Sequence, residues 1–325
     1  MKKTRNRVAL GTFPLSGVYN PIAPSDSKHL VGHFFELGGY YIDTAPMYGC
    51  GKIETLLGSV LTNKNRDDFY LISKCGKEIH PLTNSWESRA TYKDIIDQCN
   101  SSLSRLKLDY IDLYLVHSPD KNTPFEETIQ AMLDLQKIGK IKEIGVSNVT
   151  LEELKKYQKY AKIQFIQNRF SFINRSISDE FQEYLNEHKI QLIPYEILEI
   201  GQLTGSIIEE ENFGSKDVRG TTSFFQGNPL QEIRSWVKNV IKPLAKKKGM
   251  TVAQLMIAWT LTKPQIQFAL VGSTKKEYLS INLQTDSISL TKNLTEELEL
   301  SYNTLTETIR SKYSMSIKDF RGLND

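Results

Sequence analysis

The sequence predicts a (β/α)₈ barrel of the TIM type, in which a ring of parallel strands is surrounded by helices. Short apolar segments alternate eight times with helical patterns along the 325 residues. The apolar segments are rich in Val, Ile, Leu, Tyr and Phe, which is typical of parallel strands buried on both faces. No predicted strand runs into a G-x-G-x-x-G turn, which disfavours a doubly wound sheet. We therefore expect one domain spanning residues 1–325.

The eight predicted strands are short and spread over most of the chain. They are expected at residues 7–12, 40–43, 69–74, 110–117, 143–148, 164–167, 191–195 and 268–272. Helices between them have recognisable starts. Thr150 with Glu153 and Thr251 with Gln254 are predicted capping boxes, and Pro124 is expected at the first position of another helix.

Two glycine-rich or polar stretches interrupt the alternation. Residues 198–230 and residues 75–91 are predicted to be long loops over the C-terminal face of the barrel. Loops of this length in a compact domain are usually functional or disordered. From about residue 290 onwards, we expect a peripheral helix and a polar tail.

Composition narrows the class of protein. Hydrophobic content of 39% and charged content of 24% are ordinary for a globular domain, and the net charge of +3 is spread throughout. This balance argues against a nucleic acid or a membrane surface as partner. The three cysteines, Cys50, Cys75 and Cys99, are odd in number and lack zinc-ligand spacing, so we expect reduced thiols, no metal and a cytoplasmic location.

Catalytic residues of such barrels lie at the C-terminal ends of the strands, and several predicted strands of this chain end in polar residues. The second predicted strand ends at Asp43, with Tyr48 in the loop that follows, and the next two end at Lys74 and His117. Each residue alone is more often a turn cap, a solvated charge or a packing residue. Four complementary polar groups on one rim favour an active site.

These strand ends belong to longer motifs. In chain order they are GTFPLSG, IDTAPMYGCGKIETLLG, LISK, LKLDYIDLYLVH, GKIKEIGVSN, IQNRFSFINR, GQLTG and GSTKKEYLSIN. The set resembles the aldo-keto reductase superfamily over nearly the whole chain. The similarity is greatest to bacterial sugar and aldehyde dehydrogenase-like members, and looser to the β-subunits of voltage-gated potassium channels.

The resemblance implies a catalytic tetrad of Asp43, Tyr48, Lys74 and His117. Tyr48 would exchange a proton with the substrate oxygen, and the Lys74 ammonium is expected to lower the pKa of that phenol. Asp43 would hold Lys74 by a charge-assisted hydrogen bond, and His117 would orient the substrate oxygen. The activity expected is reduction of an aldehyde, ketone or sugar carbonyl, or oxidation of the corresponding alcohol.

The resemblance also implies a nicotinamide cofactor, because no side chain can supply a hydride. NADPH is expected, with NADH possible. The residues expected to bind the nicotinamide end are Ser147, Asn148, Gln167 and Tyr195. The pyrophosphate is expected at Leu198, Gly201, Leu203 and Gly205, where glycine allows close approach.

The adenosine end is expected at the start of a helix near residue 275. The residues are Gly272, Ser273, Thr274 and Lys275 for a 2′-phosphate, with Tyr278 and Asn282 at the adenine. A solvated helix start explains Lys275 and Lys276 equally well. Glu196, Tyr278 and Ile281 depart from the family's common residues, which leaves the choice between NADPH and NADH open.

The substrate is the least defined part of the prediction. Phe13, Tyr19, His80 and Trp86 lie where loops could line the pocket mouth, and their rings suit an apolar face or a sugar ring. Loop packing accounts for them equally well. A cofactor-sensing regulatory protein with slow turnover is the main alternative to an enzyme, and metal-free lyase or isomerase chemistry is a weaker one.

Overall fold

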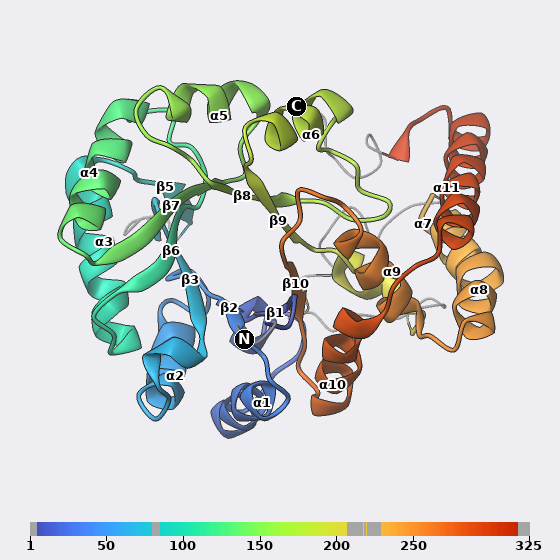
Figure 1. Cartoon of the computed structure of the whole chain (residues 1–325), viewed down its shortest axis with the longest axis horizontal. Helices are drawn as coiled ribbons and strands as arrows, with labels where there is room; N and C mark the ends of the chain where they lie inside the picture. The colour runs from blue at the N-terminus through green and yellow to red at the C-terminus, as the bar shows by residue number, and fades with distance from the viewer. Residues whose placement is uncertain (1–4, 80–84, 207–216, 218, 220–228, 318–325) are drawn as a thin grey trace.

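Eight parallel strands form a single sheet that curls into a nearly closed ring (Figure 1). The computed structural model describes residues 5–79, 85–206, 217, 219 and 229–317. The strand order is β10-β1-β2-β3-β6-β7-β8-β9, and β9 and β10 lie against each other at the remaining edge. The predicted (β/α)₈ barrel is confirmed.

All eight predicted strands are present, and each strand end lies within two residues of its predicted position. They are β1 (Val8–Gly11), β2 (Tyr41–Asp43), β3 (Tyr70–Cys75), β6 (Ile111–Val116), β7 (Ile141–Ser147), β8 (Phe165–Arg169), β9 (Gln191–Tyr195) and β10 (Ala269–Gly272).

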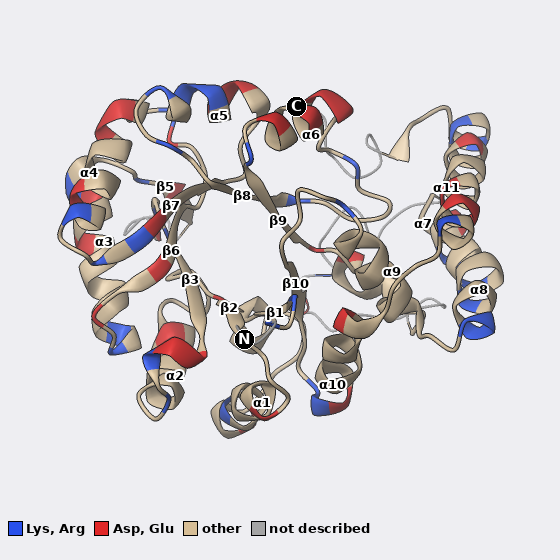
Figure 2. Ribbon diagram, viewed as in Figure 1, with Lys and Arg blue, Asp and Glu red and all other residues tan. Residues whose placement is uncertain are grey.

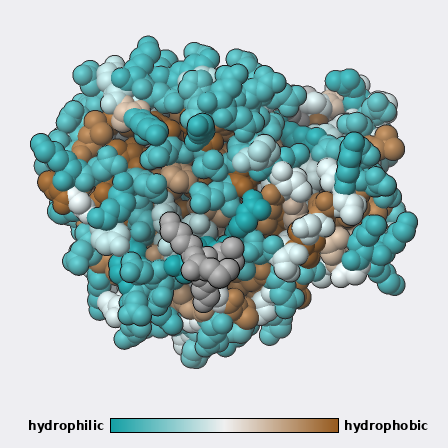
Figure 3. Space-filling view, in the orientation of Figure 1, coloured by the Kyte–Doolittle hydropathy of each residue, from teal (hydrophilic) through white to brown (hydrophobic). Residues whose placement is uncertain are grey.

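Helices surround the ring, and charged residues of both signs are distributed along them (Figure 2). Around the ring lie α1 (Pro24–Glu36), α2 (Lys52–Leu61), α3 (Tyr92–Leu106), α4 (Phe125–Lys137), α5 (Leu151–Gln158), α6 (Asp179–Glu187), α9 (Val252–Leu261) and α10 (Lys276–Gln284). Further out lie α7 (Pro229–Trp236), α8 (Lys242–Lys247) and α11 (Lys292–Tyr313). Much of the face in Figure 3 is hydrophilic, as expected where these helices meet water.

Both predicted capping boxes are present, at Thr150 with Glu153 and at Thr251 with Gln254. The prediction for Pro124 was wrong by one position. Its ψ of 136° is extended rather than helical, so it is the N-cap of α4, and Phe125 begins the helix. None of the helices within the described ranges combines the length and apolar character needed to cross a bilayer.

The predicted loop at residues 75–91 is corrected by the structure. Its described part contains a hairpin in which β4 (Lys77–Ile79) pairs antiparallel with β5 (Trp86–Ser88). Strands of three residues show too little alternation to be recognised from sequence. In the second predicted loop, Glu199–Thr204 forms a 3₁₀ turn, η3, and α7 begins at Pro229. Most of the segment between them lies outside the described residues.

The core has two layers, separated by the sheet. The outer layer lies between strands and helices, and the inner one fills the barrel with side chains such as Ile72, Leu113, Leu115 and Phe165. In the inner layer, the rings of Tyr41 and Phe268 stack with centroids 4.1 Å apart. The barrel is therefore packed inside rather than open as a pore.

Candidate active site

The pleat of the strands decides which residues point into the barrel mouth. Along β3, Ile72 points into the barrel core, Ser73 points outward, and Lys74 points inward again. The same alternation places Asp43 two residues after the inward-facing Tyr41, and Gln167 two residues after Phe165. Side chains from separate strands thus converge at the C-terminal rim.

Lys74 and Asp43 form a buried ion pair at this rim. The Lys74 ammonium lies 2.7 and 2.9 Å from the two carboxylate oxygens of Asp43, and their side chains are only 1% and 4% exposed. Lys74 also donates to the carbonyl oxygen of Thr44 (3.0 Å), and Gln167 donates from Nε2 to Asp43 (2.8 Å). A buried charge pair is tolerable when further hydrogen bonds surround it, as here.

Tyr48 completes this arrangement from the loop after β2. A turn, in which its backbone N–H donates to the carbonyl of Ala45 (3.0 Å), brings the side chain back over the rim. Lys74 Nζ lies 3.2 Å from Tyr48 Oη, and Asp43 Oδ2 lies 3.5 Å from it. The ring packs edge-on against Phe13, with centroids 5.1 Å apart. The Tyr48 hydroxyl is thus fixed next to the ion pair.

The protonation of Tyr48 differs from the expectation that Lys74 lowers its pKa. Burial raises the pKa of Tyr48 well above its ordinary value of 10.0, and the Asp43 carboxylate raises it further. Burial and the Asp43 carboxylate together outweigh the nearby Lys74 ammonium in setting the pKa of Tyr48. Burial also lowers the pKa of Lys74, while Asp43 opposes this. Tyr48 is therefore a neutral phenol, which can donate a proton.

His117 follows β6 and reaches the same rim. Its ring centroid lies 6.4 Å from that of Tyr48. Burial lowers the pKa of His117 well below 6.5, and the charges of Lys74 and Lys77 lower it further. The imidazole is thus neutral at physiological pH, and it can hydrogen-bond a substrate oxygen without bringing a charge.

The residues predicted for the nicotinamide end form a connected segment of the rim. Ser147 donates to the carbonyl of Gln167 (2.7 Å), and Asn148 donates to the carbonyl of His117 (2.8 Å). Tyr195 donates to Asn148 Oδ1 (2.6 Å). The structure brings all four predicted residues together. It also shows that Gln167 binds Asp43, a link that sequence reasoning missed.

The predicted pyrophosphate segment has an unusual backbone. Ile200 and Gly201 have φ of 53° and 101°, and Gly205 has φ of 75°. A β-branched residue with positive φ is an outlier that surrounding structure must hold in place. Leu203 is fully buried and Leu198 is half-buried, so their side chains anchor the segment to the rest of the protein.

The predicted adenosine residues surround the start of α10, whose N-cap is Lys275. Ser273 Oγ donates to the carbonyl of Lys275 (2.8 Å), which shapes this start. The remaining residues differ in exposure: Gly272, Lys275 and Tyr278 are exposed, Thr274 is intermediate, and Asn282 is buried.

Glu196, which departs from the family's common residue, is engaged elsewhere. Its Oε2 lies 2.8 Å from Arg169 Nε. Because Arg169 offsets this charge, Glu196 presents less repulsion to a nearby phosphate than an unpaired carboxylate would.

The predicted substrate residues are only partly brought together. The ring centroid of Phe13 lies 6.1 Å from that of Tyr19 and 5.1 Å from that of Tyr48, so Phe13 contacts both rings. Trp86 lies on the hairpin strand β5 and is 37% exposed, while His80 lies outside the described residues. Sequence reasoning missed Lys77 on β4, because the hairpin itself was not predicted. In the described part of the chain, no group of three or more His, Cys, Asp or Glu could hold a metal ion.

Fold and rim together define a reductase-type barrel, and comparison with known proteins identifies the family. The chain belongs to the aldo/keto reductase family, whose sequence profile matches residues 7–302. It is similar to the aldo-keto reductase YhdN of Bacillus subtilis, with 32% identity over 272 residues, covering 83% of this chain and 82% of that one.

Two further proteins resemble the chain over nearly its whole length. The NADH-specific methylglyoxal reductase of Escherichia coli is 29% identical over 317 residues, covering 91% of this chain and 96% of that one. The structure of a glycerol dehydrogenase from Gluconobacter oxydans superimposes with a TM-score of 0.83 at 25% identity, covering 97% and 94%. Membership of this family makes the chain an NAD(P)-dependent oxidoreductase, and these named relatives favour an enzyme over a regulatory protein.

Proposed function

We propose that this protein reduces a small aldehyde, ketone or sugar carbonyl with NADPH or NADH, and that Tyr48 supplies the proton. The observation that carries the proposal is the contact of one buried ammonium, on Lys74, with both the Asp43 carboxylate and the Tyr48 hydroxyl. Tyr48 is neutral and points into the mouth of the barrel, where it can donate to a carbonyl oxygen.

The rim residues suit a nicotinamide cofactor. Asn148, directly after β7, presents an exposed amide, and Tyr195, at the end of β9, presents a half-exposed ring. An exposed ammonium, on Lys275, lies at the start of α10, where backbone N–H groups favour an anion. When bound, the cofactor supplies the hydride that the protein's side chains lack.

Each catalytic side chain has one role in the proposal. Tyr48 passes its proton from Oη to the carbonyl oxygen as the carbonyl carbon is reduced. Lys74 then stabilises the resulting phenolate through its 3.2 Å contact, and Asp43 keeps Lys74 in place. His117, held neutral, hydrogen-bonds the same oxygen and fixes its direction.

The cofactor residues are assigned by their place along the rim. Ser147, Asn148 and Gln167 would bind the carboxamide, and the ring of Tyr195 would stack on the nicotinamide. The pyrophosphate would follow the backbone of Leu198, Gly201, Leu203 and Gly205. The adenosine phosphate and adenine would lie at Gly272, Ser273, Thr274, Lys275, Tyr278 and Asn282.

Further parts of the proposal concern the setting of the enzyme. All three cysteines are free thiols, which supports a cytoplasmic location. We propose that residues 1–325 act as one domain on a small-molecule substrate. The E. coli relative acts on methylglyoxal and the G. oxydans relative on glycerol, by their names, so small oxygenated three-carbon compounds are a first choice for assay.

The substitution Tyr48→Phe tests the proposal, because it removes the hydroxyl and keeps the ring that packs on Phe13. Carbonyl reduction should fall by about a hundredfold or more, the usual contribution of a general acid, while cofactor affinity is retained. The matched control is Tyr92→Phe, on the exposed start of α3, which should leave turnover unchanged. Substantial turnover by Tyr48→Phe would refute the role of Tyr48.

A further inference from the structure

The β4–β5 hairpin lies beside the catalytic rim. It follows β3 directly, so that only Gly76 separates the strand carrying Lys74 from Lys77 on β4. On the returning strand, Ser88 Oγ lies 3.3 Å from the Oγ of Ser118, the residue after His117. The hairpin therefore borders the barrel mouth on the His117 side.

The two faces of the hairpin differ in chemistry. Lys77 pairs with Ser88 and Ile79 with Trp86, and residues directly opposite in an antiparallel pair share a face. Since Ser88 contacts Ser118, this face packs against the chain segment that directly follows His117. It carries one ammonium, from Lys77, together with the apolar side chains of Ile79 and Trp86. Lys77 lies near enough to His117 for its charge to act on the imidazole.

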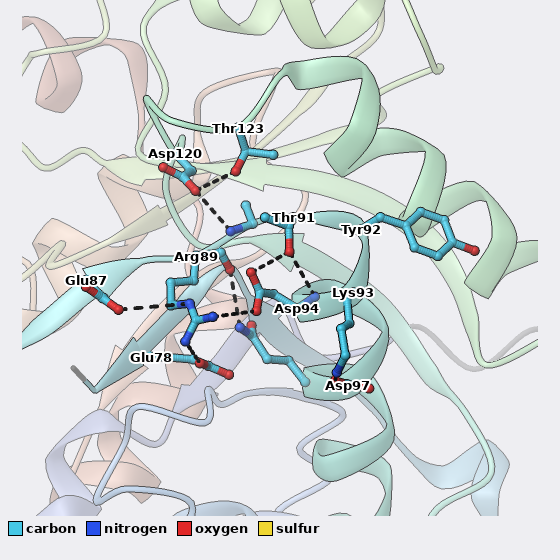
Figure 4. A network of polar contacts seen from close by, with 12 residues as sticks. Glu78, Glu87, Arg89, Thr91, Tyr92, Lys93, Asp94, Asp97, Asp120 and Thr123 are labelled. Atoms are coloured by element: carbon cyan, nitrogen blue, oxygen red, sulfur yellow. Dashed lines mark hydrogen bonds and ion pairs between the residues drawn. The ribbon is translucent and has the colours of Figure 1, made fainter. Parts of the chain in front are cut away.

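The opposite face carries the acidic residues of the hairpin, and Arg89 binds them (Figure 4). Its guanidinium lies 3.2 Å from Glu78, 4.0 Å from Glu87 and 3.3 Å from Asp94 in the first turn of α3. Gln98 of α3 donates to the carbonyl of Arg89 (3.3 Å). The hairpin is thus fastened to α3 with its carboxylates turned away from the mouth.

Lys77 has no carboxylate partner among the residues that the structure describes. Asp43, at the nearby rim, is already bound by Lys74 and Gln167. The half-buried ammonium of Lys77, close enough to the neutral imidazole of His117 to act on it, gives this side of the mouth a positive potential, which attracts anions. Strands β3 and β6, which flank this site, lie across the ring from β9 and β10, where the cofactor phosphates are proposed to bind (Figure 1).

We infer that the preferred substrates carry a carboxylate or phosphate a few atoms from the reacting carbonyl, and that Lys77 binds this anion. The inference rests on the proposed carbonyl reduction and names the substrate class. Ile79 and Trp86 would cover the carbon segment between the two groups. Arg89 is a positioning residue, because it acts through the placement of the hairpin.

The test uses pairs of substrates that differ in the anion. Succinate semialdehyde is compared with butyraldehyde, and glyceraldehyde phosphate with glyceraldehyde. Wild-type protein should prefer the anionic member of at least one pair by about tenfold in kcat/KM, as expected of a charged hydrogen bond that is partly exposed. The pair that shows the preference identifies the anion as carboxylate or phosphate.

Three substitutions locate the preference. Lys77→Gln should abolish the preference by raising KM for the anionic substrates, and it should leave turnover of the neutral aldehydes unchanged. Lys77→Arg should retain the preference. Lys93→Gln makes the same change of charge on α3, where Lys93 pairs with Asp97 away from the mouth, and should change nothing. Loss of turnover on neutral aldehydes in both Lys77 variants would show a structural role for Lys77 and overturn the inference.

The remaining outcomes are also decisive. Turnover of neutral aldehydes with no preference in wild type, or a preference that survives in Lys77→Gln, overturns the inference and leaves carbonyl reduction standing. Turnover of no substrate by wild type with either cofactor refutes the proposed function and this inference together.

Discussion

Replacing Asp43 by Asn tests how the catalytic ion pair is held. The Asn side chain keeps the shape and an oxygen that can accept from Gln167, but it removes the negative charge next to Lys74. Lys74 is 1% exposed, so its ammonium would be left buried without a counter-charge. Removing one partner of a buried pair typically costs about 3 to 5 kcal/mol.

The loss of stability should depend on pH because Lys74 can lose its proton and so remove the buried charge. Burial already lowers the pKa of Lys74 below 10.5, and Asp43 is the main influence that raises it. In Asp43→Asn the folded-state pKa therefore falls further, and the unfolded chain binds more protons than the folded one. The stability of the variant should therefore rise as the pH increases toward the pKa that Lys74 has in the unfolded chain. Deprotonation limits the penalty to about 5 kcal/mol at pH 7 and about 2 kcal/mol at pH 9.

Urea unfolding followed by tryptophan fluorescence at these two pH values measures the effect. The double variant Asp43→Asn with Lys74→Met is the control, because it removes the buried ammonium as well and should recover most of the lost stability. A loss below about 1 kcal/mol at pH 7, or a loss equal at both pH values, would refute the buried-charge argument. Failure of the double variant to recover would do the same.

Further predictions concern pH and the cofactor. Tyr48 and His117 both stay neutral across the physiological pH range and beyond it. We therefore expect kcat/KM for carbonyl reduction to show no inflection between about pH 6.5 and 9. Alcohol oxidation needs the phenolate of Tyr48 and should rise with pH throughout this range; an inflection near pH 6.5 in a pH–rate profile would contradict a neutral His117. Lys275→Gln should weaken the binding of NADPH by about fivefold and leave the binding of NADH unchanged, while Lys276→Gln should affect the binding of neither cofactor. Equal weakening of NADPH and NADH binding by Lys275→Gln would exclude a contact of Lys275 with the 2′-phosphate.

Much of this fold could be predicted from local patterns. Each of the eight strands is an apolar segment whose ends are marked by polar or turn residues, and the structure places those ends within two residues. The hairpin was missed because β4 and β5 have only three residues each, too few for an alternating pattern. Pro124 was misplaced because a proline suits both the N-cap and the first helical position.

The site was predictable in its members and less so in its electrostatics. Strand ends and motifs indicate Asp43, Lys74 and His117, because alternation along a parallel strand is a local property. The contact of Gln167 with Asp43 joins β8 to β2 across the barrel, and only closure of the ring brings them together. The raised pKa of Tyr48 depends on burial and on the close approach of the Asp43 carboxylate, neither of which a sequence displays.

The central claim is that Tyr48 protonates a carbonyl beside a bound nicotinamide cofactor. In the most direct measurement, wild type and Tyr48→Phe are titrated with NADPH and then, separately, with NADH, and binding is followed by fluorescence. Methylglyoxal is then added, and the absorbance of the reduced cofactor is recorded. We expect equal cofactor affinity in both proteins, with rapid oxidation of the cofactor in wild type and almost none in Tyr48→Phe. Binding of neither cofactor by wild type, or equal oxidation in the two proteins, would contradict it.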